Sequence, residues 1–487
     1  MPGIVPNPMK FISTFLLLLP AILCFSQKEE KDQVHPWYLN HILSLSDSTG
    51  VAGLLYQEKK SGVAFLDNNG NVSTELSLSG PVIGVAKWKN NIVAVYSDQW
   101  DTWHAIKEVH AVLIDGKTRA ILSDQLLYSN PGKNAIICSL NSDDRGNFGY
   151  LLIRTTGQPG NYDLNSEKDL RRLEATTAAT VIFLSDPFQP LAKSLTSVAI
   201  GTNYLSSYAN NKGEIAILSY TDGQVVAEKF GRDGQLQKKI TAPLPDYTPM
   251  FRDWNDGLRG LFNPSSADVL TFSLANPDLG RKHRNLSTFV FDFSNGKASV
   301  LESAKLDKDY YNQLKTDAAL DKTKHFKEVE DLRADGIIYL GDTVAVINEI
   351  RYYEVGTPNI RFFSEGTIMS LYDRQYHLLH RFFLDRFYEK IGDGGRGWTY
   401  HVRNGKIMAV CNEIHGAEHF DNICYIIDPK TYTMDRKVLD WGNIPRMSMS
   451  DMQTVFWFRN NLLKDASAGG HFLSSRFTTS LVKVDFP

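Results

Sequence analysis

The chain has few cysteines, and after its first 26 residues it has no long apolar run. Its four cysteines are Cys24, Cys138, Cys411 and Cys424. This number excludes a fold held by disulfides, because such scaffolds are short chains dense in cysteine. A membrane helix needs roughly twenty apolar residues in a row. We therefore expect a mature chain without a membrane span, held together by ordinary apolar packing.

An excess of charge of one sign is also missing. The 487 residues include 52 Lys and Arg against 55 Asp and Glu, a formal net charge of -3. A general nucleic-acid binder would be strongly basic, so this balance argues against nucleic acid as a partner. Because 43% of the residues are hydrophobic, the chain can bury a large core. No Walker loop or G-x-S-x-G elbow occurs, and nothing in the sequence requires a cofactor.

The first 26 residues have the pattern of a secretory signal peptide. Lys10 precedes an apolar run over residues 11–23, and the small residue Ser26 stands before Gln27. We expect cleavage after Ser26 and a secreted or periplasmic mature protein. A lipid anchor on Cys24 is disfavoured, because that processing requires a small residue where Leu23 stands.

Residues 398–441 contain one complete four-stranded unit. Strands are predicted at residues 398–402, 407–414, 423–428 and 433–439, from alternating apolar and polar residues. The turn Asn404-Gly405 joins the first two strands, a polar loop of about eight residues the second and third, and Pro429-Lys430-Thr431 the last two.

A strand that ends in Asp before a tight turn recurs along the chain. Aspartate suits this position because its carboxylate accepts hydrogen bonds from the turn's backbone amides. Spacings between these residues run from 47 to 81, which is typical of four-stranded repeats. The repeated residues are Asp67, Asp115, Asp186, Asp233, Asp292, Asp373, Asp428 and Asp485.

These repeats resemble those of secreted β-propeller proteins, without matching a named family. The resemblance implies an all-β fold of four-stranded blades, eight if every Asp turn ends a blade and seven if one does not. The chain stops two residues after Asp485, so we expect a strand from residues 34–43 to complete the last blade and close the ring. Residues 27–487 form a single domain, with short helical insertions at about 155–178 and 304–335.

Three second strands align without gaps, at residues 94–100, 345–351 and 409–415. Asp98, Glu349 and Glu413 occupy equivalent positions in them, with Trp100, Arg351 and His415 two residues later. Carboxylates in register around a ring could act as acid, base or cation ligands. The alternative is that each carboxylate bonds its own loop or a neighbouring blade.

The loops that join second and third strands share one end of a propeller with the loops between blades, where ligands usually bind. We expect these loops at residues 97–108, 276–285, 349–365 and 413–421. Aromatic and arginine side chains in or beside them suit sugar rings, but also suit blade caps or a protein interface. The candidate ligand-binding residues are Trp100, Trp103, Arg351, Tyr352, Tyr353, Arg361, Arg396 and Trp254.

Cys411, His415, His419 and Cys424 form a possible two-Cys, two-His metal set. A disulfide between Cys411 and Cys424 across the hairpin and two separate buried thiols are the alternatives. His415 to His419 also spells H-x-x-E-H, but that zinc-protease motif works only on a helix, and this segment is a loop between strands.

Two functions remain open. The first is an exported propeller that binds a glycan or protein partner without catalysis. The second is a polysaccharide-active enzyme, either a hydrolase using two of Asp98, Glu349 and Glu413 or a lyase using His104 or His415 with a Tyr and an Arg. Carboxylates about 5 to 9 Å apart beside an open cleft would favour the hydrolase. Carboxylates already engaged in the fold would favour the binding module.

Overall fold

The chain is seen in a computed structural model. The residues that it describes are 36–44, 50–56, 61–66, 72–98, 107–129, 135–142, 149–156, 176–183, 191–195, 204–244, 258–275, 285–305, 307–317, 332–355, 360–391, 398–415, 419–439, 455–458, 461–465 and 481–484. Within these ranges, no helix has the length and apolar character needed to cross a membrane.

The described strands form eight antiparallel sheets, seven with four strands and one with three. The first four sheets are β1 (Pro36–Ser44), β2 (Gly50–Tyr56), β3 (Ser61–Leu66), β4 (Val72–Leu78); β5 (Val82–Trp88), β6 (Asn91–Ser97), β7 (Glu108–Ile114), β8 (Ile121–Ser129); β9 (Ala135–Asn141), β10 (Tyr150–Thr156), β11 (Thr176–Phe183), β12 (Leu191–Leu195); and β13 (Tyr204–Ala209), β14 (Ile215–Thr221), β15 (Gln224–Phe230), β16 (Leu236–Pro243).

The second half of the chain repeats this order. Its sheets are β17 (Leu258–Asn263), β18 (Ser266–Ala275), β19 (Asn285–Asp292), β20 (Lys297–Lys305); β21 (Leu332–Leu340), β22 (Thr343–Val355), β23 (Ile360–Tyr372), β24 (Leu378–Ile391); β25 (Trp398–Arg403), β26 (Lys406–His415), β27 (His419–Asp428), β28 (Thr433–Leu439); and the three-stranded β29 (Val455–Phe458), β30 (Asn461–Asp465), β31 (Leu481–Val484).

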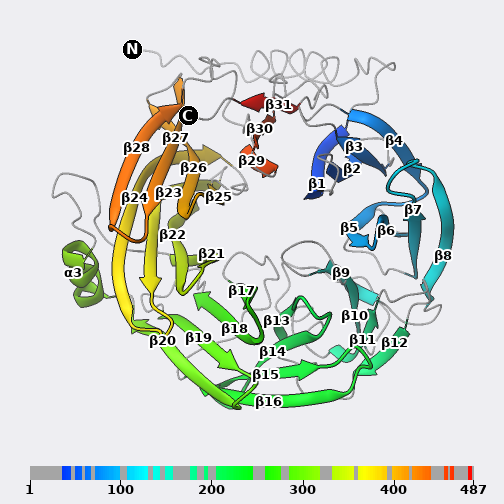
Figure 1. Ribbon diagram of the computed structural model, residues 1–487, viewed down its shortest axis with the longest axis horizontal. Helices are drawn as coiled ribbons and strands as arrows, with labels where there is room; N and C mark the ends of the chain where they lie inside the picture. The colour runs from blue at the N-terminus through cyan, green and yellow to red at the C-terminus, as the bar shows by residue number, and fades with distance from the viewer. Residues whose placement is uncertain are drawn as a thin grey trace, which may run out of the picture.

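The sheets follow one another around a central axis in the order of the sequence (Figure 1). The first strands of neighbouring sheets contact one another, as β5 does with β9 and β17 with β21. They lie nearest the axis, and the last strands lie at the periphery (Figure 1). Burial follows this arrangement, because β6 is almost wholly buried and β28 almost wholly exposed.

The sheet β25–β28 confirms the unit that the sequence predicts, with β25 one residue longer and β26 and β27 clearly longer than expected. Asn404 and Gly405 both have positive φ, 51° and 75°, as a tight two-residue hairpin turn requires. β26 and β27 stay paired as far as His415 and His419, so the expected eight-residue loop is wrong. His415 and His419 therefore lie on strands.

The Asp turns act as predicted wherever they are described. The carboxylate of Asp115 accepts the amides of Lys117 and Thr118 at 2.9 and 2.6 Å. Asp428 accepts the amide of Lys430 at 2.9 Å. Asp233, Asp292 and Asp373 accept amides of their own turns in the same way. Asp67, Asp186 and Asp485 lie outside the described residues.

The expected strand exchange at the ring's end differs from the structure. β1 covers most of residues 34–43, and it pairs with β2 in the first sheet. In the described part of the chain, β29–β31 pair only with one another. The physical reason is that β1 has an adjacent antiparallel partner a few residues away in the chain, which costs less loop entropy than a partner at the other terminus.

One helix is described, and it lies in the second predicted insertion. α3 (Lys308–Asp317) begins after Asp307, whose carboxylate accepts the amides of Asp309 and Tyr310 at 3.0 and 3.1 Å. This arrangement is an N-cap. The helix stands outside the ring beside β20 and β24 (Figure 1). The helix expected at residues 166–174 lies outside the described residues.

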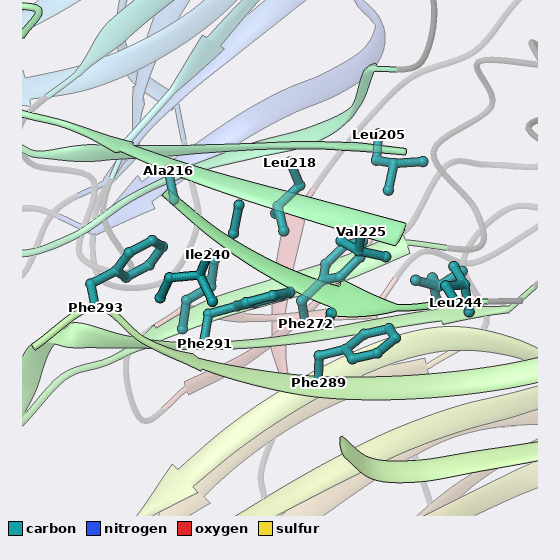
Figure 2. Packing of buried hydrophobic residues seen from close by; sticks show 14 of the residues in the cluster. Leu205, Ala216, Leu218, Val225, Ile240, Leu244, Phe272, Phe289, Phe291 and Phe293 are labelled. Atoms are coloured by element: carbon teal, nitrogen blue, oxygen red, sulfur yellow. The ribbon is translucent and has the colours of Figure 1, made fainter. Parts of the chain in front are cut away.

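The core lies between successive sheets. Figure 2 shows the layer between β13–β16 and β17–β20, where Phe272, Phe289 and Phe291 pack with Leu218 and Ile240. All five side chains are at most 4% exposed. Alternation along each strand sends every second side chain into such a layer, which explains the periodicity in the sequence.

Candidate functional site

The three aligned carboxylates lie on second strands or directly after one, as the alignment predicts. Asp98 follows β6, and Glu349 and Glu413 lie in β22 and β26. The carboxylate of Asp98 accepts the amides of Lys107 and Glu108, both at 3.0 Å. These bonds hold the two ends of the loop between β6 and β7 together. The Asp98 carboxylate therefore acts within its own loop.

Glu349 is buried between the sheets β21–β24 and β25–β28. Glu349 is 1% exposed, and its Oε1 lies 3.1 Å from a guanidinium nitrogen of Arg386. Arg386 is itself 2% exposed. The hydroxyl of Ser364 donates to the same oxygen at 2.7 Å. Arg386 also lies over the ring of Trp398, 5.7 Å from its centroid. The charge of Glu349 is thus neutralised inside the core.

Glu413 on the facing sheet is also paired with an arginine, but this arginine is partly exposed. Its carboxylate is ion-paired with Arg436 of β28, and the Glu413 residue is 4% exposed. Beside this pair, the hydroxyl of Tyr425 donates to the backbone oxygen of Asp385 at 2.5 Å, which joins the two sheets. We call Glu349, Arg386, Glu413 and Arg436 the ionic layer.

Strand alternation explains why both pairs share one layer. Ala345 and Ile347 precede Glu349 on the same face of β22, and Ala409 and Cys411 precede Glu413 on the same face of β26. These apolar residues pack in one cluster between the two sheets. Glu349 and Glu413 are the next residues on the same faces of β22 and β26. Each buried carboxylate then needs a cationic partner, because an unpaired buried charge is very costly.

The ionic layer has no arrangement of free acid and base groups. Each carboxylate is ion-paired with an arginine and is at most 4% exposed, so neither faces open solvent where a substrate could reach it. Buried pairs of this type hold two elements in one geometry, and breaking one partner is strongly destabilising. The arrangement suits the positioning of two sheets.

The two cysteines of β26 and β27 are separate thiols, and the disulfide and shared-metal alternatives are wrong. Cys411 is in register with Ile423, and Cys424 with Val410. Neighbouring residues of a strand point to opposite faces, so this offset of one residue puts the thiols on opposite sides of the sheet. Both are free and buried, and burial raises the pKa of each to about 12.

His415 and His419 lie directly opposite each other, as the last residue pair of the β26–β27 hairpin. One metal could not be shared by these residues with both Cys411 and Cys424, because the cysteines lie on opposite faces. In the described ranges, no group of three or more His, Cys, Asp and Glu side chains is placed to hold a metal ion.

Four candidate ligand-binding residues lie on strands and not in the expected loop. Arg351, Tyr352 and Tyr353 belong to β22 and Arg361 to β23, where the pairing continues to Val355 and Ile360. Only residues 356–359 separate the strands. The aromatic and β-branched residues of this segment favour a strand, which extends the hairpin through the predicted loop.

Other candidates lie outside the described residues. They are Trp100, Trp103, His104, Trp254 and Arg396. Sequence reasoning missed Arg386 and Arg436, the partners of the two glutamates. For Arg386 a signal existed, because it continues the inward-facing positions of β24 after the buried residues Phe382 and Leu384.

A ring of four-stranded antiparallel sheets, with the first strands around the axis, defines a β-propeller, and the chain has this architecture. No protein-family model matches the chain, and no curated protein matches it.

Solved structures with a similar fold include other propellers. The chain is 11% identical to Saccharomyces cerevisiae Sqt1, over 89% of this chain and 94% of that one, with a TM-score of 0.43. It is 12% identical to the Dos1 propeller, over 77% and 76%, with a TM-score of 0.39. It is 10% identical to the propeller domain of the Trilobed protease from Pyrococcus furiosus, over 83% and 92%, with a TM-score of 0.37. Such a fold hosts many unrelated functions.

Proposed function

We propose that the protein is an exported β-propeller that binds a glycan or protein partner without catalysis. The observation that carries this proposal is the state of the three aligned carboxylates. Glu349 and Glu413 are buried and paired with arginines, and Asp98 closes its own loop. A glycoside hydrolase needs two carboxyl groups facing the scissile bond, one of them free to give a proton.

The proposed binding surface is the end of the ring where second and third strands are joined. β22, β23 and β24 are the longest strands described, with 13, 13 and 14 residues. Their extension carries Arg351, Tyr352 and Tyr353 beyond Glu349 toward that end. Aromatic rings with arginines suit stacking and edge hydrogen bonds with a sugar or peptide. The ionic layer supports this extension by fixing β22 and β24 against the next sheet.

The propeller is proposed to have eight blades, one for each sheet, and to reach its site after export. The apolar run of residues 11–23 and the small residue Ser26 support the action of a signal peptide. The mature chain would then begin at Gln27 and act outside the cytoplasm, where extracellular glycans and protein partners occur.

The test is a thermal-shift screen of the protein from Gln27 onward against neutral and anionic oligosaccharides, with and without divalent metals. A ligand that binds only the folded state raises the melting temperature by mass action. We expect a shift with one class of oligosaccharide, and its loss in Tyr353→Ala. Tyr432→Ala is the matched control, because Tyr432 is exposed in the β27–β28 turn at the opposite end of the strands.

Each hit would also be incubated with the protein and assayed for new reducing ends or unsaturated products. Release of either product would replace the binding module with the polysaccharide-active enzyme. No shift with any oligosaccharide or metal would remove glycans as ligands. An unaltered shift in Tyr353→Ala would place the binding surface elsewhere.

A further inference from the structure

The outer strand β28 is more regular than the other long outer strands. It is in register with β27 at seven consecutive pairs without a shift. The outer strands β4, β8, β16, β20 and β24 all have at least one register shift against their neighbours. β12 and β31 are regular too, but have only five and four pairs. A bulge twists an edge away from pairing with another chain, and β28 lacks this protection.

The surface of β28 is also open. All residues from Thr433 to Val438 are exposed, and two of them are apolar, Met434 at 36% and Val438 at 56%. In the described sheets, β27 is the one hydrogen-bonded neighbour of β28. The outward edge therefore presents backbone groups that a further strand could pair with.

The sequence of β28 is complementary to itself when it is read in the opposite direction. Around the central Arg436, Asp435 stands on one side and Lys437 on the other, with Met434 and Val438 next in each direction. An antiparallel copy centred on Arg436 would place Asp435 opposite Lys437 and Met434 opposite Val438. Both kinds of pair would occur twice, because the arrangement has a two-fold axis.

We propose that β28 pairs with β28 of a second copy of this chain, so that the protein forms a symmetric dimer through this edge. Side chains directly opposite in an antiparallel pair lie about 5 Å apart at Cβ, close enough for the ion pairs and apolar contacts described. Main-chain hydrogen bonds supply affinity, as in other strand additions, and the side-chain pairs fix the register.

The central Arg436 would face its own counterpart in the dimer. This like-charge contact is offset because each Arg436 is already ion-paired with Glu413 of its own chain. The dimer does not depend on the proposed ligand site. It would join the outer surfaces of two rings and leave the ends of both rings accessible.

Sedimentation velocity over a range of protein concentrations tests the dimer. The wild-type protein is expected to shift from monomer to dimer as its concentration rises. Asp435→Lys turns both symmetric ion pairs into repulsive pairs, so the dissociation constant should rise about tenfold or more. The double variant Asp435→Lys with Lys437→Asp exchanges the two charges and should restore the wild-type dissociation constant.

Lys238→Asp on β16 is the matched control, because Lys238 is exposed on an outer strand that carries a bulge. It should leave the dimer unchanged. Circular dichroism would check that every variant keeps its strands, and Val438→Lys provides a second disruptive variant. A monomer at all concentrations, a dimer insensitive to Asp435→Lys, or a double variant that fails to recover would overturn the proposal.

Discussion

Two layers between neighbouring sheets differ in where they place charge. The layer between β13–β16 and β17–β20 is packed with aromatic and aliphatic side chains (Figure 2). Lys229 in this layer lies near the end of β15, before the turn to β16. Its ammonium group lies 2.6 Å from Glu214 and is also paired with Asp268. These carboxylates are 17% and 37% exposed, so water still solvates them.

The layer between β21–β24 and β25–β28 contains the ionic layer. Glu349 and Arg386 are 2% and 1% exposed at their side chains, so water contributes almost nothing to their solvation. The cost of losing a charged partner therefore depends on where the remaining charge lies. A charge left in the core has no solvent to replace its partner, whereas a charge at a turn has.

The largest effect is expected from Glu349→Ala. It leaves the guanidinium of Arg386 unpaired in the core, and we expect the free energy of unfolding to fall by about 3–5 kcal/mol. Urea denaturation followed by circular dichroism measures it. A double variant, Glu349→Leu with Arg386→Met, should recover most of this loss, since no buried charge remains. A loss below about 1 kcal/mol in Glu349→Ala would contradict the buried ion pair.

Leu218→Ala tests the apolar layer. Leu218 is fully buried among phenylalanines, so its truncation creates a cavity and should cost about 3 kcal/mol. The same denaturation measurement applies, repeated at low and high salt. The loss should not change with salt, because no charge is involved. A salt-dependent loss would show that the two layers are not chemically distinct.

Lys229→Met should cost less than Glu349→Ala, about 1–2 kcal/mol, because Glu214 and Asp268 stay partly solvated when their partner is removed. Burial raises the pKa of Glu214, but hydrogen bonds from Lys229 and Asn210 outweigh it and hold the pKa below its ordinary value. In the variant, NMR titration should find this pKa higher than in the wild type. A cost equal to that of Glu349→Ala would contradict the role of solvation.

The smallest effect is expected at the turn between β27 and β28. Backbone hydrogen bonds, first from Lys430, lower the pKa of the partly exposed Asp428. The folded pKa lies below the unfolded one, so its stabilisation is present above about pH 4 and is lost as pH falls through the folded pKa. Asp428→Asn should remove this part of the acid dependence, measured by thermal melts from pH 2 to 7. An unchanged acid limb would show that the carboxylate does not stabilise the turn.

Local residue patterns predicted the strands and their turns well. The four strands around Asn404 appear where alternation placed them, and the Asp turns bond their own amides. Both features depend on a few neighbouring residues, because side chains alternate along a strand and a short carboxylate reaches only nearby amides.

Contacts between strands distant in sequence could not be predicted in the same way. The alignment put Glu349 and Glu413 at equivalent positions, but their partners Arg386 and Arg436 lie 37 and 23 residues away. The near symmetry of Cys411 and Cys424 suggested a bridge, and a register offset of one residue separated them. Register depends on how two strands meet, which no single strand specifies.

The sequence by itself determined the alternating strands, the Asp turns and the repeated unit, because each follows from the conformational preferences of adjacent residues. The tertiary structure decided which carboxylates are neutralised in the core and which thiols are separated by a sheet. It also decided which edge is left open. These properties depend on the packing of whole sheets against one another, and burial and pairing are defined only after that packing exists.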